Sequence, residues 1–179
     1  MHAGELDAAL ALLAELPSTS ARHYDRLCLE GLVLRRLRRF ADAERVLGAA
    51  IELHRRGPTA LVERAWLWLD QQRHAEAMVD AELAVKNAQN GKPEVMAAAF
   101  SVYGHALGWS GDLPNAVVAL QKAVELQPEH AEMHTQLGWA LFYSHRFAEA
   151  AVACARALEL APGWLGAMAL REAIAAPRP

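Results

Sequence analysis

The chain has 179 residues, 54% of them hydrophobic, which is enough apolar material for one core of ordinary size. Its 18 basic residues are balanced by 21 acidic ones, so the overall charge gives no reason to expect nucleic acid or an anionic membrane as a partner. No stretch is apolar for the roughly 18 residues that a transmembrane helix needs, and we therefore expect no membrane span.

The first predicted element is a helix over residues 5–16, in which Leu6, Leu10 and Leu13 follow one helical face. Pro17 and the serine- and threonine-rich residues after it predict its end. The run carries acidic residues and no basic leading segment, so we do not expect a signal peptide.

Four helix–turn–helix segments follow, over residues 24–57, 58–91, 97–130 and 131–164, and the last shows their common pattern most fully. In its first half Leu137, Gly138 and Leu141 recur at helical spacing. The second half repeats this spacing with a set of small and apolar residues: Phe147, Ala150, Ala151, Cys154, Ala157 and Leu158. Pro162 predicts the end of the second helix, because proline has no N–H to donate.

The segment 58–91 departs most from this pattern, at Arg64, Ala65 and His74. Its string QRHAEA still parallels HRFAEA of the last segment and fixes its register. Five extra residues precede the segment 97–130, and they predict either a longer loop or a longer helix at its start. A last helix is predicted over residues 165–175.

The recurring small and apolar residues at a period of about 34 resemble a tetratricopeptide-repeat (TPR) protein. The residues that carry the resemblance are Leu137, Gly138, Leu141, Phe147, Ala150, Ala157 and Pro162. The resemblance implies an all-α fold, a right-handed α-solenoid of stacked antiparallel helix hairpins, in one domain over 1–179. The helix over 5–16 then corresponds to an N-terminal half-repeat, and the helix over 165–175 to a C-terminal cap.

In TPR proteins the first helix of each repeat lines a concave surface, so the resemblance also implies a partner-binding groove. The residues expected to face it are Trp66, Leu69, Ser101, His105, Trp109, Glu132, Thr135, Trp139, Phe142 and Tyr143, with Gly108 on the same face. Aromatic rings dominate its second half, and several rings on an open surface predict that a partner or another copy covers them. Packing of the tryptophans between neighbouring first helices stays open as the alternative.

Two other groups of residues are candidate sites. Arg35, Arg36, Arg38 and Arg39 form either a patch for an acidic partner or a solvated helix end, where cations favour the helix dipole. His130 and His134, four residues apart, could share a helix face and hold a metal ion, but HAEMH is not the HExxH pattern of zinc proteases. Packing of His134 is the alternative.

No nucleophile–base pattern, phosphate loop or CxxC pair is evident, so we expect no active site and no cofactor. The leading hypothesis is a non-enzymatic scaffold or adaptor that binds a peptide or helix of another protein, of which a small chaperone is a special case. The alternatives are a regulatory or substrate-recruiting arm of a larger enzyme, such as a transferase, and a self-associating module. Cys28 and Cys154 are far apart and are expected inside helices as small apolar residues, which favours a reducing, cytoplasmic setting.

Overall fold

The computed structural model describes residues 3–15 and 22–176, which form ten helices and no strand. The expected helix end around Pro17 and the last three residues of the chain lie outside the described residues. The chain divides into two compact units, Met1–Ala88 and Gln89–Pro179. Within the described residues, no helix combines the length and the hydropathy that a bilayer crossing requires.

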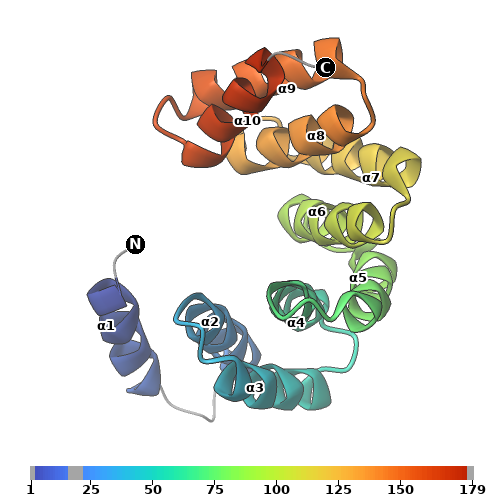
Figure 1. The fold of residues 1–179 in the computed structure, drawn as a ribbon. Helices are drawn as coiled ribbons and strands as arrows, with labels where there is room; N and C mark the ends of the chain where they lie inside the picture. Colours follow the sequence, from blue (N-terminus) through green and yellow to red (C-terminus); the bar gives the residue numbers. More distant parts are fainter. Residues whose placement is uncertain (1–2, 16–21, 177–179) are drawn as a thin grey trace. The chain divides into compact units, whose positions relative to one another are not determined.

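The first unit holds α1 (Ala3–Ala14), α2 (His23–Arg36), α3 (Phe40–Leu53), α4 (Pro58–Asp70) and α5 (His74–Ala88). Three-residue turns join α2 to α3 and α4 to α5, so each pair forms an antiparallel hairpin (Figure 1). The two hairpins pack on each other through α3 and α4, and α1 packs on α2. Their core is made of fully buried alanines and leucines, including Ala43, Leu47, Ala60, Leu61 and Leu67.

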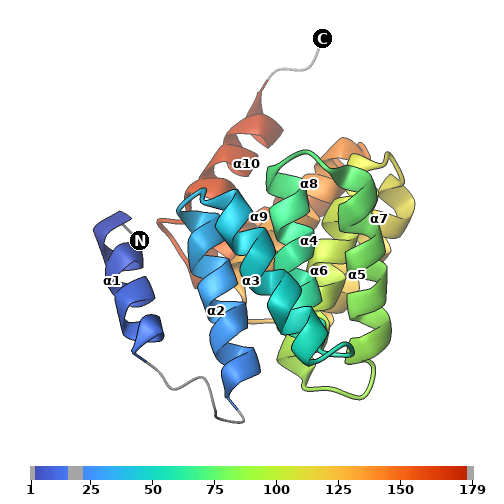
Figure 2. The same cartoon turned by 90° about the horizontal axis from the view of Figure 1, so that it is seen from below.

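The second unit holds α6 (Pro93–Trp109), α7 (Leu113–Leu126), α8 (Ala131–Tyr143), α9 (Phe147–Leu160) and α10 (Leu165–Ala175). Here α6 pairs with α7 and α8 with α9, while α10 lies against α8 and α9 (Figures 1 and 2). The extra residues before position 97 lengthen α6, which begins at Pro93 and has 17 residues. Proline suits this first helical position, because the N–H that it lacks would have no partner there.

Small residues hold the two helices of a hairpin close together. A Cβ added to Gly104 of α6 would lie 2.6 Å from Cγ of Leu120 in α7 and 3.1 Å from the carbonyl oxygen of Ala116. Gly31 meets Leu47 of α3 in the same way, and Ala65, whose exposed fraction is 0%, takes the corresponding place in α4. Helices can approach this closely only where a side chain is absent or very small.

The turn inside each hairpin contains one residue in the left-handed region. The four are Arg38, Gln72, Gly111 and His145, with φ values of 59°, 61°, 87° and 59°. The recurrence of this conformation at matching places in the four hairpins shows that the same turn is built four times. Only the third turn uses glycine, the residue to which this conformation costs least.

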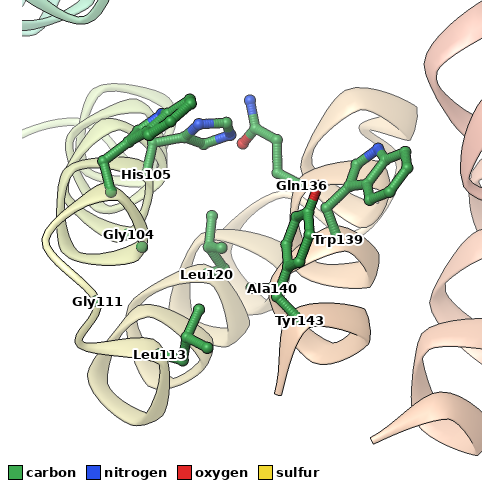
Figure 3. A pocket seen from close by; sticks show the side chains of 11 residues that line it. Gly104, His105, Gly111, Leu113, Leu120, Gln136, Trp139, Ala140 and Tyr143 are labelled. Carbon is green, nitrogen blue, oxygen red and sulfur yellow. The ribbon is translucent and has the colours of Figure 1, made fainter. Parts of the chain in front are cut away.

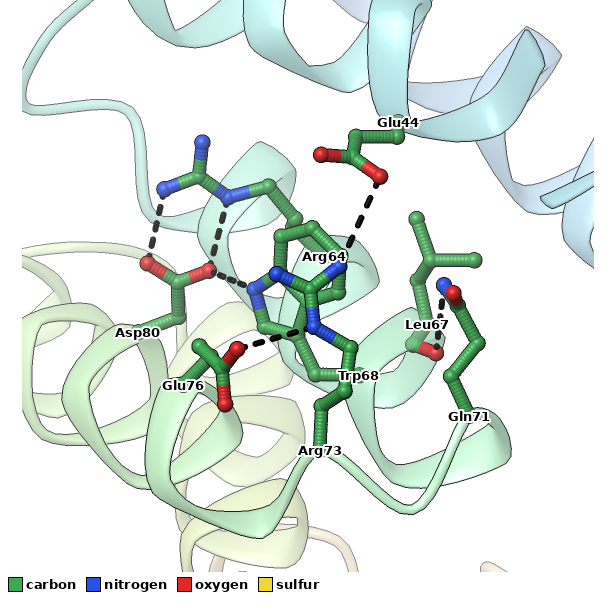
Figure 4. A network of polar contacts seen from close by, with 8 residues as sticks. All are labelled: Glu44, Arg64, Leu67, Trp68, Gln71, Arg73, Glu76 and Asp80. Atoms are coloured by element: carbon green, nitrogen blue, oxygen red, sulfur yellow. Dashed lines mark hydrogen bonds and ion pairs between the residues drawn. The ribbon is translucent and has the colours of Figure 1, made fainter. Parts of the chain in front are cut away.

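The departure at Arg64 in the second hairpin is accompanied by a polar network (Figure 4). Arg64 donates to both carboxylate oxygens of Asp80, over 2.7 and 2.8 Å, and Trp68 donates to the same carboxylate. Arg73 lies over the Trp68 ring at 3.8 Å from its centroid and donates to Glu76. The network ties α4 to α5 across the hairpin.

Both cysteines behave as the sequence predicts. Cys28 in α2 and Cys154 in α9 are free and buried. Burial raises the pKa of the Cys28 thiol to about 12, so this thiol stays protonated and packs as a small apolar side chain.

Candidate functional site

A pocket of about 580 Å³ lies in the second unit, between α6 and α8, with α7 as its floor. Its lining consists of Gly104, His105, Gly108, Trp109, Gly111, Leu113, Leu120, Gln136, Trp139, Ala140 and Tyr143. Figure 3 shows Leu120 and Leu113 at the base, with His105 on the α6 side and Trp139 and Tyr143 on the α8 side. The volume falls within the roughly 300–1,000 Å³ range of small-ligand pockets.

The α8 wall of the pocket is aromatic. The rings of Trp139 and Tyr143 stack with an interplanar angle of 24° and a centroid distance of 5.8 Å. Phe142 packs edge-on against both of these rings. It also packs edge-on against Phe147 of α9. Since Trp109 is 65% exposed and Tyr143 is 60% exposed, large ring surfaces on both walls face solvent.

The polar groups of the pocket are few and uncharged. Ser101, which is buried in α6, donates a hydrogen bond of 2.6 Å to Oε1 of Gln136 in α8. This bond occupies the amide oxygen, so the NH₂ group is what Gln136 can offer to a ligand. Burial lowers the pKa of His105 to about 4, and its imidazole is therefore neutral at pH 7. None of the lining residues carries a formal charge at neutral pH.

Four of the residues expected in the groove meet in this pocket: His105, Trp109, Trp139 and Tyr143. Three others from the second unit take different places. Ser101 and Thr135 are buried, at 4% and 5% exposure, and Thr135 donates to the carbonyl oxygen of Ala131 in its own helix. The groove prediction places these two hydroxyl groups on an open surface. In the structure both side chains are buried instead. Phe142 is half-buried against the core that includes Leu137 and Leu141.

The remaining groove residues do not line the pocket. Glu132 is half-buried in the first turn of α8. Trp66 and Leu69 lie on α4 in the first unit, where both are half-buried and Leu69 packs against the core of that unit. These three stay predictions as contacts for a partner.

Two of the four arginines of the candidate cationic patch are engaged in ion pairs, while Arg36 is exposed, and the patch stays a prediction. The side chain of Arg35 is only 10% exposed, and it donates to Asp70 over 2.8 Å and lies 3.7 Å from Glu63. Arg39 pairs with Asp42 over 2.8 Å, and Arg38 lies over the ring of Phe40. The partners of Arg35 cannot be read from the sequence, because α4 brings Asp70 and Glu63 to it from a distant part of the chain.

His134 takes the packing role that was the alternative to a metal ligand. Its exposed fraction is 9%, and its Nε2–H donates to the carbonyl oxygen of Pro128 over 2.8 Å. His130 precedes α8 and is exposed. Among the residues that the structure describes, no three histidine, cysteine or acidic side chains gather as a metal site would require.

Sequence reasoning missed Gln136 and the floor residues Leu113 and Leu120. Gln136 could have been found from its spacing, because it lies three residues before Trp139 in α8 and therefore on the same helical face. The floor could not be found from one helix, since α7 supplies Leu113 and Leu120 after a turn. How deep this floor lies depends on how closely Gly104 lets α7 approach α6.

The fold and the pocket define an all-α protein built from helix hairpins that stack on one another within each unit. A family model described as Tetratricopeptide repeat matches residues 28–93 and 104–163, which together make up well over half of the chain. The chain belongs to the tetratricopeptide-repeat family. Proteins of this family are typically interaction modules.

Solved structures agree with this fold. The TPR protein TTC0263 of Thermus thermophilus matches with a TM-score of 0.80 and 18% identity, over 96% of this chain and 91% of that one. The APC/C hetero-tetramer Cut9–Hcn1 matches with a TM-score of 0.81 and 18% identity, over 97% of this chain. The present chain spans only 33% of the length of that match.

A third similar structure is YrrB, described as a TPR protein with an unusual peptide-binding site. It matches with a TM-score of 0.64 and 17% identity, over 94% of this chain and 84% of that one. At these identities the likeness establishes the fold alone. No curated protein matches the sequence.

Proposed function

We propose that the chain is a non-enzymatic protein-interaction module whose pocket between α6 and α8 receives an uncharged, apolar anchor side chain from a segment of a partner protein. The observation that carries the proposal is the convergence of the exposed rings of Trp109 and Tyr143 on a pocket whose lining has no charge. The other rings and Gln136 shape its walls.

The energetic argument rests on the exposed aromatic surface. Covering one large ring removes up to about 150–250 Å² from water. At about 25 cal/mol per Å², this corresponds to an upper bound of roughly 4–6 kcal/mol for a ring that starts fully exposed. Trp109 and Tyr143 are more than half exposed, so a partner that covers both gains a substantial part of this free energy. Immobilisation of the partner offsets some of the gain.

The chemistry of the pocket selects against charged anchors. A carboxylate or ammonium group entering it would lose water and meet no opposite charge, because the lining is uncharged and His105 is neutral. An apolar side chain meets Leu120, Ala140 and the rings instead. The amide NH₂ of Gln136 can bind a carbonyl oxygen of the segment that carries the anchor.

The test uses five blocked peptides, Ac-Gly-Gly-Xaa-Gly-Gly-NH₂, in which Xaa is Trp, Phe, Leu, Lys or Glu. Each is titrated into the ¹⁵N-labelled protein, and amide shifts of the pocket residues report binding. We expect the three apolar peptides to shift the amides of Gly104, Gly108 and Gly111, and the two charged peptides to leave them unchanged.

Two variants make the test specific. Trp109→Ala combined with Tyr143→Ala should weaken the apolar peptides by about tenfold or more, as expected for anchors that contact large rings. Trp164→Ala is the matched control, because Trp164 is also exposed in the second unit but does not line the pocket. Equal binding of charged and apolar peptides, no binding of any of them, or no effect of the double variant would overturn the proposal.

Self-association and a role as the arm of a larger enzyme stay predictions. If another copy of the chain fills the pocket, sedimentation velocity will show a mass that rises with concentration, and the Trp109→Ala and Tyr143→Ala double variant will abolish the rise. That result would replace the partner protein by a second copy.

A further inference from the structure

Three glycines line the pocket, and two of them have a structural reason to be glycine. Gly104 leaves room for Leu120, whose Cγ would lie 2.6 Å from an added Cβ. Gly111 has a φ of 87°, in the left-handed region that side chains disfavour. Neither reason requires a ligand.

Gly108 has neither reason. It lies in the last turn of α6, its backbone is helical, and an added Cβ would meet nothing within 4 Å. Glycine within a helix is less stable than alanine, because it loses more backbone entropy on folding. In the empty protein, then, alanine would fit at this position and would strengthen the helix. An alanine methyl group at position 108 would occupy space in the pocket, because Gly108 is part of its lining.

We propose that Gly108 is a specificity-determining residue, whose bare backbone lets a planar aromatic side chain of the partner lie flat against α6. This inference rests on the proposed function, and it narrows the anchor from any apolar side chain to an aromatic ring. The ring would lie between the α6 backbone and the stacked pair of Trp139 and Tyr143.

The geometry of the two walls favours a flat group. Gly104 and Gly108 are four residues apart, so they lie on the same face of α6, one turn from each other. Leu120 packs against Gly104, so the bare backbone that faces the open pocket is that of Gly108. On the α8 side, the rings of Trp139 and Tyr143 are nearly parallel, with an interplanar angle of 24°. Aromatic rings prefer offset-stacked or edge-to-face contact with other rings, which a branched aliphatic side chain cannot make.

The chain offers a matched control in the first unit. Gly48 also lies inside a helix, α3, and an added Cβ there would again meet nothing within 4 Å. It does not line the pocket. Gly48 shows that an unfilled place beside a glycine is not a site in itself, so the inference depends on the position of Gly108 between the pocket walls.

The experiment compares Gly108→Ala with Gly48→Ala, using the Trp, Phe and Leu peptides described above. Both variants should raise the melting temperature, Gly48→Ala by about 2–4 °C and Gly108→Ala by less, because alanine is the better helix former and position 108 is in the last turn of its helix. Wild-type protein should bind the Trp and Phe peptides more tightly than the Leu peptide. Gly108→Ala should weaken the Trp and Phe peptides by about tenfold, the effect of one carbon in an apolar pocket, and should remove their advantage over Leu. Gly48→Ala should leave all three affinities unchanged.

The failures are distinguishable. If wild-type protein binds none of the apolar peptides, both the proposed function and this inference fall. If it binds them, but Gly108→Ala and Gly48→Ala behave alike, or if the Leu peptide binds as tightly as the Trp and Phe peptides, only this inference falls. A Gly108→Ala variant that is more stable and binds the aromatic peptides less well supports it, because misfolding cannot produce that combination.

Discussion

The indole Nε1–H of Trp68 donates a hydrogen bond of 2.8 Å to Oδ2 of Asp80, and the two side chains join α4 to α5 at the centre of the first unit's polar network (Figure 4). Asp80 is 4% exposed, and Arg64 donates two further hydrogen bonds to the same carboxylate. A buried carboxylate is stable only when its oxygens are paired in this way. Asp80 of α5 therefore holds two side chains of α4, those of Arg64 and Trp68.

The first prediction concerns Asp80→Ala. This change leaves the Arg64 guanidinium and the Trp68 N–H without their acceptor, and it should lower the free energy of unfolding by about 2–4 kcal/mol. Urea denaturation followed by far-ultraviolet circular dichroism measures the loss. Asp42→Ala, which breaks the exposed pair with Arg39, is the control and should change stability little. Equal effects of the two changes would contradict the structural role given to Asp80.

The second prediction is a pH dependence carried by His105. Its pKa is about 4 in the folded protein and about 6.5 when unfolded, so between these values the unfolded chain binds more protons. The stabilising contribution is therefore complete above about pH 6.5 and is lost as the pH falls towards 4. We expect a loss of about 1–2 kcal/mol between about pH 7.5 and pH 5.

His105→Gln should remove that part of the loss, as measured by urea denaturation at the two pH values. His130→Gln, a change at an exposed histidine, should leave the difference as large as in the wild type. If His105→Gln retains the full difference, the acid sensitivity comes from other groups and the burial of His105 is not its cause.

The third prediction uses the repeated hairpin turn. Gln72 has a φ of 61°, and the left-handed conformation costs a residue with a side chain about 1 kcal/mol. Gln72→Gly removes this cost but adds freedom to the unfolded chain, so we expect a net gain of about 0.5 kcal/mol. Gly111→Ala should do the opposite and lose about 1 kcal/mol. Opposite shifts of the urea midpoint verify the prediction, and shifts of the same sign would refute it.

The fourth prediction concerns the hydrogen bond between Ser101 and Gln136 that joins α6 to α8. Ser101→Ala leaves the buried Oε1 of Gln136 without its donor and should cost about 1–2 kcal/mol. The double change with Gln136→Leu removes both polar groups, so its cost should be smaller than the sum of the two single costs. A double-mutant cycle from chemical denaturation measures this coupling. Additive costs would show that the two side chains do not stabilise each other.

The sequence by itself determined the repeat. Small residues such as Gly104 and Gly138, apolar residues at helical spacing, and Pro162 act through local and nearest-neighbour packing, which a period of about 34 residues displays directly. It also placed His105, Trp109, Trp139 and Tyr143 on one side of their helices, because helical periodicity determines which residues share a face.

Only the tertiary structure decided which of these faces form a site. Ser101 lies on the same helix as His105, but it is buried because Gln136 of α8 meets it there. The charge of Arg35 is paired and mostly buried, because α4 brings Asp70 to it. The floor of the pocket comes from α7, at a depth that depends on the close approach at Gly104. Each outcome depends on contacts between helices that are distant in sequence, and the periodicity of one helix carries no information about the side chains of its neighbour.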